Sequence, residues 1–168
     1  IVGTCGRVLN DHETIPANTD VSTGKMNWIG TEFLQQFWST RKQEIDFPYG
    51  CNMSFRASVL KKVNGFDERF PKIFEEIDLG KRVGKYGKLF FVPKGLAYHH
   101  KAKSGGTRTD MIHKMRMIYR YYGLYIAKHV MFPLSIVTLI LRTRTVLREA
   151  PYALKDLISG YFSHYLTR

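Results

Sequence analysis

Cysteine and long apolar runs are scarce in this sequence. Cys5 and Cys51 are the only cysteines, and they match neither a disulfide-rich scaffold nor the paired spacing of a zinc site. Two buried thiols in a reducing compartment are the simplest interpretation. The opening residues, IVGTCGRVLN, have no basic segment and no cleavage site, so they do not resemble a signal peptide. The longest apolar run, Val130–Leu141, is shorter than the ~20 residues that span a bilayer.

Acidic residues are also scarce, above all near the C-terminus. The 168 residues include 26 Lys and Arg but only 14 Asp and Glu, and residues 101–168 hold 12 of the former and three of the latter. This asymmetry favours an anionic partner for that segment, either nucleic acid or acidic lipid. A hydrophobic content of 44% and an aromatic content of 14% exclude a disordered chain and provide for an ordinary core.

Strand and helix patterns alternate over the first 100 residues. We expect strands at 1–9 and 45–55, a short helix at 29–38, and helices at 56–65 and 75–87, each of the last two ended by a glycine. Two short strands are expected around the Pro93–Gly95 turn, followed by three helical pieces broken near Pro133 and Pro151. This order predicts an α/β fold with a helical C-terminal tail, although the strands and helices are few for a complete core.

Three carboxylates, Glu75, Glu76 and Asp78, lie at the start of the helix expected over FEEIDLGKRVGKYG, residues 74–87. Acids in a first helical turn complement the helix dipole, and Asp78 and Arg82 have the i, i+4 spacing of a salt bridge. Alternatively, a carboxylate at this position takes up a proton as a general base. Spacing alone leaves both interpretations open.

The segments on either side of these acids supply further motifs. Upstream are Gly50, Asn52, Ser54 and Arg56, then Gly65, Phe66, Asp67 and Glu68; downstream are His99 and the segment SGGTR at 104–108. Together with Glu75, Glu76, Asp78, Leu79 and Arg82, these residues resemble the C-terminal half of the family 2 glycosyltransferases, which have the GT-A fold. The similarity extends over roughly residues 1–108, with several motifs in the family's order and spacing.

The resemblance implies a partial GT-A fold, a Rossmann-like mixed sheet with flanking helices followed by a helical tail. Residues 1–109 would form the acceptor-side half of the domain, and residues 110–168 a basic amphipathic tail. The family's donor-binding half carries an Asp-x-Asp motif, which is absent from this sequence. We therefore expect a C-terminal part of a longer protein that binds donor poorly by itself.

In the family, a sugar moves from a nucleoside diphosphate to an acceptor hydroxyl with inversion, here a hexosyl or deoxyhexosyl group. The resemblance makes Glu76 the catalytic base and Glu75 its helper, with Asp78 structural. His99 would approach a divalent metal, Mn²⁺ or Mg²⁺, unless it merely packs at the sheet edge. Three residues are expected to contact the acceptor: Asn52, Ser54 and Arg56. Five are expected to contact the donor diphosphate: Lys103, Ser104, Gly105, Gly106 and Arg108. Alternatively, these five residues belong to a solvated loop without a ligand.

The basic tail favours a peripheral position on the cytoplasmic membrane surface, because basic residues and tyrosines lie on either side of its apolar run, as in helices that lie in the membrane interface. The resemblance adds a lipid-linked or cell-surface glycan as the acceptor. Alternatively, the tail packs on a missing half or on a second subunit of a homo-oligomer. A non-catalytic basic module that binds nucleic acid, or that serves as an assembly partner, is the rival to the enzyme; we expect no nucleic-acid binding, since no recognised motif for it occurs.

Overall fold

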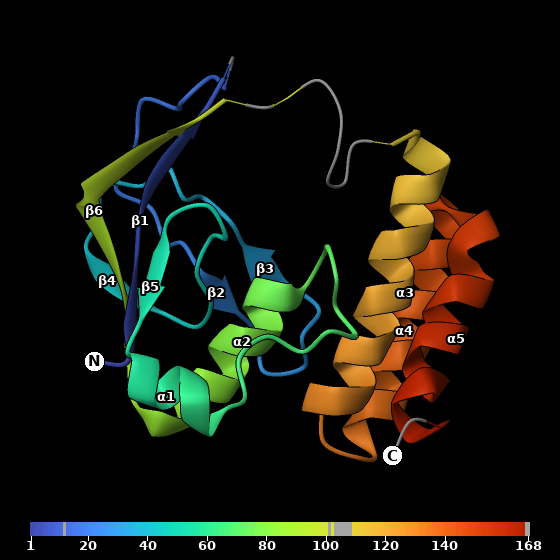
Figure 1. Cartoon of the computed structure of the whole chain (residues 1–168). Coiled ribbons are helices and arrows are strands. Elements are labelled where there is room, and N and C mark those ends of the chain that lie inside the picture. The colour runs from blue at the N-terminus through green and yellow to red at the C-terminus, as the bar shows by residue number, and fades with distance from the viewer. Residues whose placement is uncertain (12, 101, 103–108, 167–168) are drawn as a thin grey trace. The chain divides into compact units, whose positions relative to one another are not determined.

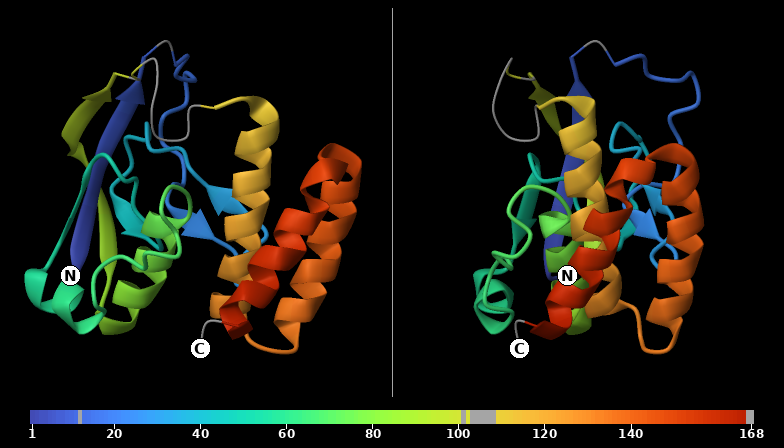
Figure 2. Two further views of the ribbon diagram at one scale, coloured as in Figure 1. Left: turned by 45° about the vertical axis from the view of Figure 1, so that its right-hand side comes forward. Right: turned by 90° about the vertical axis from the view of Figure 1, so that its right-hand side faces the viewer.

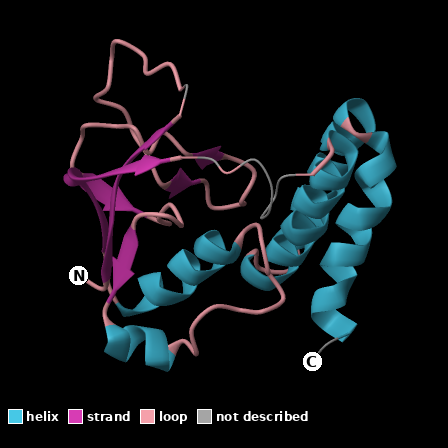
Figure 3. Ribbon diagram, turned by 45° about the horizontal axis from the view of Figure 1, so that its top comes forward, coloured by secondary structure: helices cyan, strands magenta, loops and turns pink. Residues whose placement is uncertain are grey.

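The computed structural model describes residues 1–11, 13–100, 102 and 109–166. The chain forms two compact units (Figure 1). Unit 1 comprises Ile1–Met26, Phe33–Arg69 and Glu75–Ala102, and unit 2 comprises Asn27–Glu32, Phe70–Phe74 and Lys103–Arg168. All the strands that the structure describes belong to unit 1, whereas unit 2 is built on helices (Figure 3).

A four-stranded mixed sheet forms the centre of unit 1, in the order β4-β6-β1-β5. Its central strands, β1 (Gly3–Asn10) and β6 (Leu89–His99), run parallel. The edge strands β4 (Gln43–Ile45) and β5 (Met53–Phe55) are antiparallel to their neighbours. The ribbon of β2 (Lys25–Met26) and β3 (Phe33–Leu34) is separate. The α/β class with a mixed sheet, flanking helices and a helical C-terminal region is confirmed.

Strand β6 is one strand, not the two short strands expected. It passes the Pro93–Gly95 turn through a bulge, so that Gly6 pairs with Val92 while Arg7 pairs with Leu96. The bulge is held from outside the strand: the Asn52 Nδ2 donates to the Gly95 carbonyl at 2.7 Å and to the Arg7 carbonyl at 3.0 Å. Gly6 is needed there, because a Cβ would lie 2.0 Å from the Gly95 oxygen.

The helix expected at residues 29–38 is wrong; the structure has a turn and then β3. Asn27 explains the difference, because its side-chain oxygen accepts from the backbone N–H groups of Thr31 at 2.8 Å and Glu32 at 3.3 Å. Such side-chain bonds to nearby backbone offer an alternative to helix formation. Phe37, expected on one face of that helix, is instead buried in unit 1, stacked on Tyr49 with 5.2 Å between ring centroids.

Two helices flank the sheet in unit 1. Helix α1 (Ala57–Lys62) ends before Gly65, which has the positive φ of +62° that favours glycine. Helix α2 (Glu75–Val83) continues as a 3₁₀ turn, Gly84–Tyr86. Leu79 and Val83 are fully buried, and Gly80 lets the backbones approach, since a Cβ there would lie 2.6 Å from the Asp46 carbonyl oxygen.

Unit 2 consists of α3 (Met111–His129), α4 (Leu134–Glu149) and α5 (Leu154–Leu166), the last preceded by the 3₁₀ turn Pro151–Ala153 (Figure 2). The three predicted helical pieces are thereby confirmed. Helices α3 and α5 cross closely, because a Cβ at Gly160 would lie 1.8 Å from the Arg120 carbonyl oxygen. None of the described helices combines the length and the apolar character needed to cross a membrane.

Residues 27–32 join unit 2 through hydrogen bonds from the helices. The Tyr122 hydroxyl donates to the Gly30 carbonyl at 2.6 Å, and Arg142 donates both to the Tyr122 oxygen, at 2.8 Å, and to the Thr31 carbonyl. The Arg142 guanidinium also lies over the Tyr122 ring, 4.8 Å from its centroid. The Arg142 side chain therefore stabilises unit 2 through contacts within that unit.

The close approach at Gly80 yields a stability prediction. We expect Gly80→Ala to lower the free energy of unfolding by about 1–3 kcal/mol, because the added methyl group meets backbone that cannot move freely. Gly84→Ala is the matched control: a Cβ there meets nothing within 4 Å, so the variant should be neutral or more stable by up to about 1 kcal/mol. Chemical denaturation measures both, and equal effects would contradict the packing described.

Candidate active site

The three acids at the start of α2 have separate roles in the structure. Asp78 is fully buried and accepts from the Arg82 Nε at 2.8 Å. The Arg82 Nη1 in turn donates to the Val63 and Gly65 carbonyls, at 2.7 Å each, just after α1. Asp78 therefore anchors the helix through Arg82, as its i, i+4 spacing predicts.

Glu76 is the perturbed acid of the helix. Burial, followed by the charge of Glu75, raises the pKa of Glu76 from 4.5 to about 7. A side-chain hydrogen bond with Glu75 acts in the same direction, whereas the backbone N–H groups of Glu76 and Gly50 donate to the carboxylate and oppose the rise. Gly50 lies close to this carboxyl group, since a Cβ there would be 3.3 Å from the Glu76 Oε1. A carboxyl group that ionises near neutral pH is suited to general base catalysis.

Glu75 supports the perturbation of its neighbour. Its Oε2 is buried, and among the residues that the structure describes it has no hydrogen-bond partner. Buried polar atoms in proteins are normally paired, and an exception calls for an explanation such as a bound ligand or water. The Glu75 oxygen is therefore a second candidate contact for a substrate hydroxyl.

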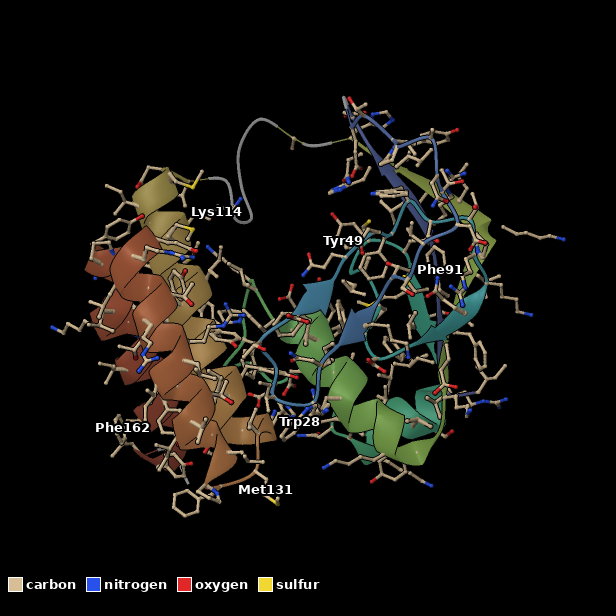
Figure 4. The ribbon with its side chains drawn as sticks, turned by 180° about the vertical axis from the view of Figure 1, so that it is seen from behind. Trp28, Tyr49, Phe91, Lys114, Met131 and Phe162 are labelled. Carbon is tan, nitrogen blue, oxygen red and sulfur yellow. The ribbon has the colours of Figure 1, made fainter. Side chains whose placement is uncertain are left out.

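Tyr49 lies beside the candidate site, and the sequence motifs did not single it out. Its backbone is fixed at two points: its N–H lies 3.2 Å from the Cys5 Sγ, and its carbonyl accepts from the Asn52 N–H at 3.1 Å. Its ring stacks on Phe37 and meets the His99 ring edge-on, with the centroids of the Tyr49 and His99 rings 6.2 Å apart. Tyr49 is labelled in Figure 4. Burial, and then the nearby acidic groups of Cys51, Glu13 and Glu76, raise the pKa of Tyr49. Its position directly before Gly50 was the available sequence signal.

The two cysteines near this tyrosine are both free thiols. Cys5 is buried, and burial is the main cause that raises its pKa to about 11, so it is an unreactive core residue. Cys51 is exposed, which corrects the expectation that both thiols are buried.

His99 lies at the carboxyl end of β6, beside Asn10 at the carboxyl end of β1. Its Nδ1 is 3.0 Å from the Asn10 Oδ1, so the Nε2 is the nitrogen left for a ligand. The adjacent His100 pairs instead with Asp11, at 2.7 Å. Within the described part of the chain, no cluster of three His, Cys, Asp or Glu residues could hold a metal ion. His99 alone does not make a metal site, and its binding of Mn²⁺ or Mg²⁺ stays a prediction.

The three expected acceptor contacts all have partners within unit 1. Asn52 uses its amide nitrogen at the β6 bulge, the Ser54 Oγ lies 2.8 Å from the Thr4 Oγ1, and the Arg56 Nε donates to the Ile1 carbonyl at 2.6 Å. These bonds join β5 and its flanks to β1. Contact with an acceptor stays a prediction for all three. The expected diphosphate contacts, Lys103, Ser104, Gly105, Gly106 and Arg108, lie outside the described residues.

Comparison with known proteins gives two related matches. The chain is 36% identical over 77 residues to the N-acetylglucosaminyl-diphospho-decaprenol L-rhamnosyltransferase of Mycobacterium tuberculosis, strains CDC 1551 / Oshkosh and ATCC 25618 / H37Rv. The chain is related to a glycosyltransferase. The match covers 45% of this chain and about a quarter, 25%, of the length of these curated relatives. No family model matches the chain, and no solved structure matches it.

The pKa of Glu76 yields a prediction about stability and pH. The pKa of Glu76 is about 7 in the folded chain, and its ordinary value of 4.5 applies to the unfolded chain. As the pH rises from 4.5 to 7, the unfolded chain therefore releases this proton before the folded chain does, and the free energy of unfolding falls. Glu76→Gln cannot ionise. We expect it to raise the melting temperature relative to the unsubstituted chain at about pH 8, by a few degrees, and to change it little at about pH 5.

Glu44→Gln is the matched control. Glu44 is half-buried on β4, and a hydrogen bond with Lys88, 2.7 Å away, lowers its pKa, so its ionised form is the one favoured by folding. Its amide variant should gain no stability at either pH. Equal losses for Glu76→Gln at both pH values would contradict the prediction.

Proposed function

We propose that this chain is the acceptor-side part of an inverting glycosyltransferase. The enzyme would transfer a hexosyl or deoxyhexosyl group from a nucleoside diphosphate to a hydroxyl of a lipid-linked or cell-surface glycan. Glu76 carries this proposal, because its carboxyl group has a pKa of about 7 in a chain related to a glycosyltransferase. The names of the relatives, which give a rhamnosyl group and a diphospho-decaprenol acceptor, support the deoxyhexosyl and lipid-linked alternatives.

In this mechanism, ionised Glu76 accepts the proton of the acceptor hydroxyl. The hydroxyl oxygen bonds to the anomeric carbon, while the bond from that carbon to the diphosphate oxygen breaks on the opposite face and leaves its electron pair on the diphosphate. With a pKa near 7, Glu76 is largely ionised at slightly alkaline pH and is still basic enough to take the proton. Glu75 holds the acceptor hydroxyl in place through its buried Oε2.

The donor side of the reaction rests on predictions alone. A divalent cation, when bound, would neutralise charge on the leaving diphosphate. His99 supplies one nitrogen toward such an ion, and further ligands would have to come from the diphosphate or from elsewhere in the protein. In this proposal, specificity for the nucleotide lies in a donor-binding half other than this acceptor-side part.

Tyr49 fits the acceptor side of this proposal. Aromatic rings bind the apolar faces of sugars, and the Tyr49 ring is held between Phe37 and His99 next to the backbone that contacts Glu76. We therefore assign Tyr49 as a wall of the acceptor site.

The first test of the function is Glu76→Gln. We expect a loss of transfer of about 10²–10⁴-fold, the size of a lost general base, together with a KM for the acceptor that changes far less. Release of nucleoside diphosphate from a panel of nucleotide hexoses and deoxyhexoses, with a polyprenyl-diphosphate sugar as acceptor, measures the rate in a protein that joins this chain to a donor-binding half. Glu44→Gln is the control for charge, since it lies on β4 and pairs with Lys88. Full activity of Glu76→Gln would overturn the assignment.

The second test concerns Tyr49. Tyr49→Leu should raise the KM for the acceptor by about tenfold while kcat changes little, because ring contact is lost but the base is intact. Tyr49→Phe keeps the ring and should retain most of the affinity. Tyr86→Leu is the control, as Tyr86 is an exposed ring on the 3₁₀ turn after α2. An unchanged acceptor KM in Tyr49→Leu would refute the assignment.

A further inference from the structure

An apolar surface with arginines among its residues covers the outer side of α4. We propose that this surface, the α4 face, binds a bilayer containing acidic lipids. The α4 face consists of nine exposed residues of α4 and of the turn before it: Met131, Phe132, Ile136, Val137, Ile140, Leu141, Arg144, Leu147 and Arg148. Pro133 and Glu149, at the two ends of this segment, are exposed as well. Met131 and Phe132 are the most exposed of its apolar residues, at 73% and 69%.

The helical spacing makes this surface continuous. Ile136, Ile140 and Leu147 are separated by four and seven residues, so their side chains lie along one side of α4. The opposite side packs within unit 2: Val146 is fully buried, and the Ser135 Oγ lies 2.9 Å from the Tyr161 hydroxyl. The α4 face is therefore not the surface that builds the unit.

The charges on the α4 face are positive. The sequence from residue 127 to residue 148 contains no Asp or Glu but holds Lys128, Arg142, Arg144 and Arg148. Arg142 is engaged with Tyr122, whereas Arg144 and Arg148 are exposed on the face itself. Arginine places its stem among apolar groups and its guanidinium at lipid phosphates, so this combination fits the headgroup layer of an acidic bilayer.

Of the acids at unit 2's three helices, only Glu149 pairs with a charge of the α4 face, that of Arg148. Asp110 accepts from the His113 N–H at the start of α3, and Asp156 pairs with Arg116 at 2.9 Å at the start of α5. Glu149, at the end of α4, pairs with Arg148 at 3.0 Å. Among the described residues of these helices, Arg144 therefore faces no acid, and the first three turns of α4 are free of negative charge.

The same charges disfavour a second copy of the chain as the occupant. A two-fold dimer would press the α4 face against itself, which would bury Arg144 and Arg148 in an apolar interface. Interface cores are depleted of charged residues for this reason. Helix α5 adds further exposed apolar residues that could contact a bilayer: Phe162, Tyr165 and Leu166. Phe162 lies toward the same end of unit 2 as Met131, away from Lys114 (Figure 4).

The test is flotation of the full chain with vesicles of phosphatidylcholine alone and of phosphatidylcholine with about a third phosphatidylglycerol. We expect binding to the acidic vesicles that weakens with added salt, and little binding to phosphatidylcholine alone. Arg144→Gln with Arg148→Gln should weaken binding by about tenfold or more. Ile140→Asn should weaken it at every salt concentration, since it removes apolar contact rather than charge. These measurements need no donor or acceptor, so their outcome is independent of transferase activity.

The matched control removes two positive charges elsewhere, by Lys61→Gln with Lys85→Gln, both at exposed positions in unit 1. Circular dichroism should show that all variants are folded. Equal weakening by the two double variants would mean that net charge alone drives binding, and it would overturn the proposal. So would the absence of binding to acidic vesicles, or a dimer in sedimentation that Ile140→Asn dissociates, which would make a second copy the occupant.

Discussion

The buried ion pair between Asp78 and Arg82 determines where the first turn of α2 lies. Arg82 bonds Asp78 within α2 and two carbonyls after α1, so one guanidinium joins two helices. Removing one partner of such a pair leaves an uncompensated buried charge, which typically costs about 3–5 kcal/mol. Gly80 lets the same helix approach the backbone at Asp46 and Phe47. Because these contacts fix the helix, Glu75 and Glu76 are held next to Gly50.

The sheet is held in a corresponding way by Asn52. Its amide nitrogen donates to the Gly95 carbonyl in the β6 bulge and to the Arg7 carbonyl of β1, and its backbone N–H donates to the Tyr49 carbonyl. A single asparagine thus connects the central strands to the turn that carries Tyr49 and Gly50. The positions of the proposed base, Glu76, and of the proposed aromatic wall, Tyr49, therefore depend on two side chains, Arg82 and Asn52, through bonds within the protein.

Local patterns in the sequence predicted those parts of the fold that local physics determines. The i, i+4 spacing gave the Asp78–Arg82 pair, Gly65 marked the end of α1, and Pro133 and Pro151 marked the breaks between the C-terminal helices. The errors arose where distant or unusual contacts decide. The continuity of β6 depends on Asn52, more than 40 residues upstream, and the turn at 27–32 depends on an asparagine side chain that captures backbone N–H groups. The role of Tyr49 follows from its neighbours in space, which no periodicity shows.

Glu76 and Asp78 lie two residues apart, yet the fold treats their charges in opposite ways. Asp78 is fully buried with a guanidinium at 2.8 Å, so its negative charge is compensated where it stands. No cation among the described residues lowers the pKa of Glu76; the groups that lower it are two backbone N–H groups, and burial together with Glu75 outweighs them. Above neutral pH the ionised form of Glu76 therefore reduces the stability of the fold. An exposed acid in the first turn would stabilise the helix dipole as well as the buried Glu76 does. Burying this acid beside another acid makes physical sense where a proton has to be taken up at neutral pH, and that is the property that proton transfer from an acceptor hydroxyl requires.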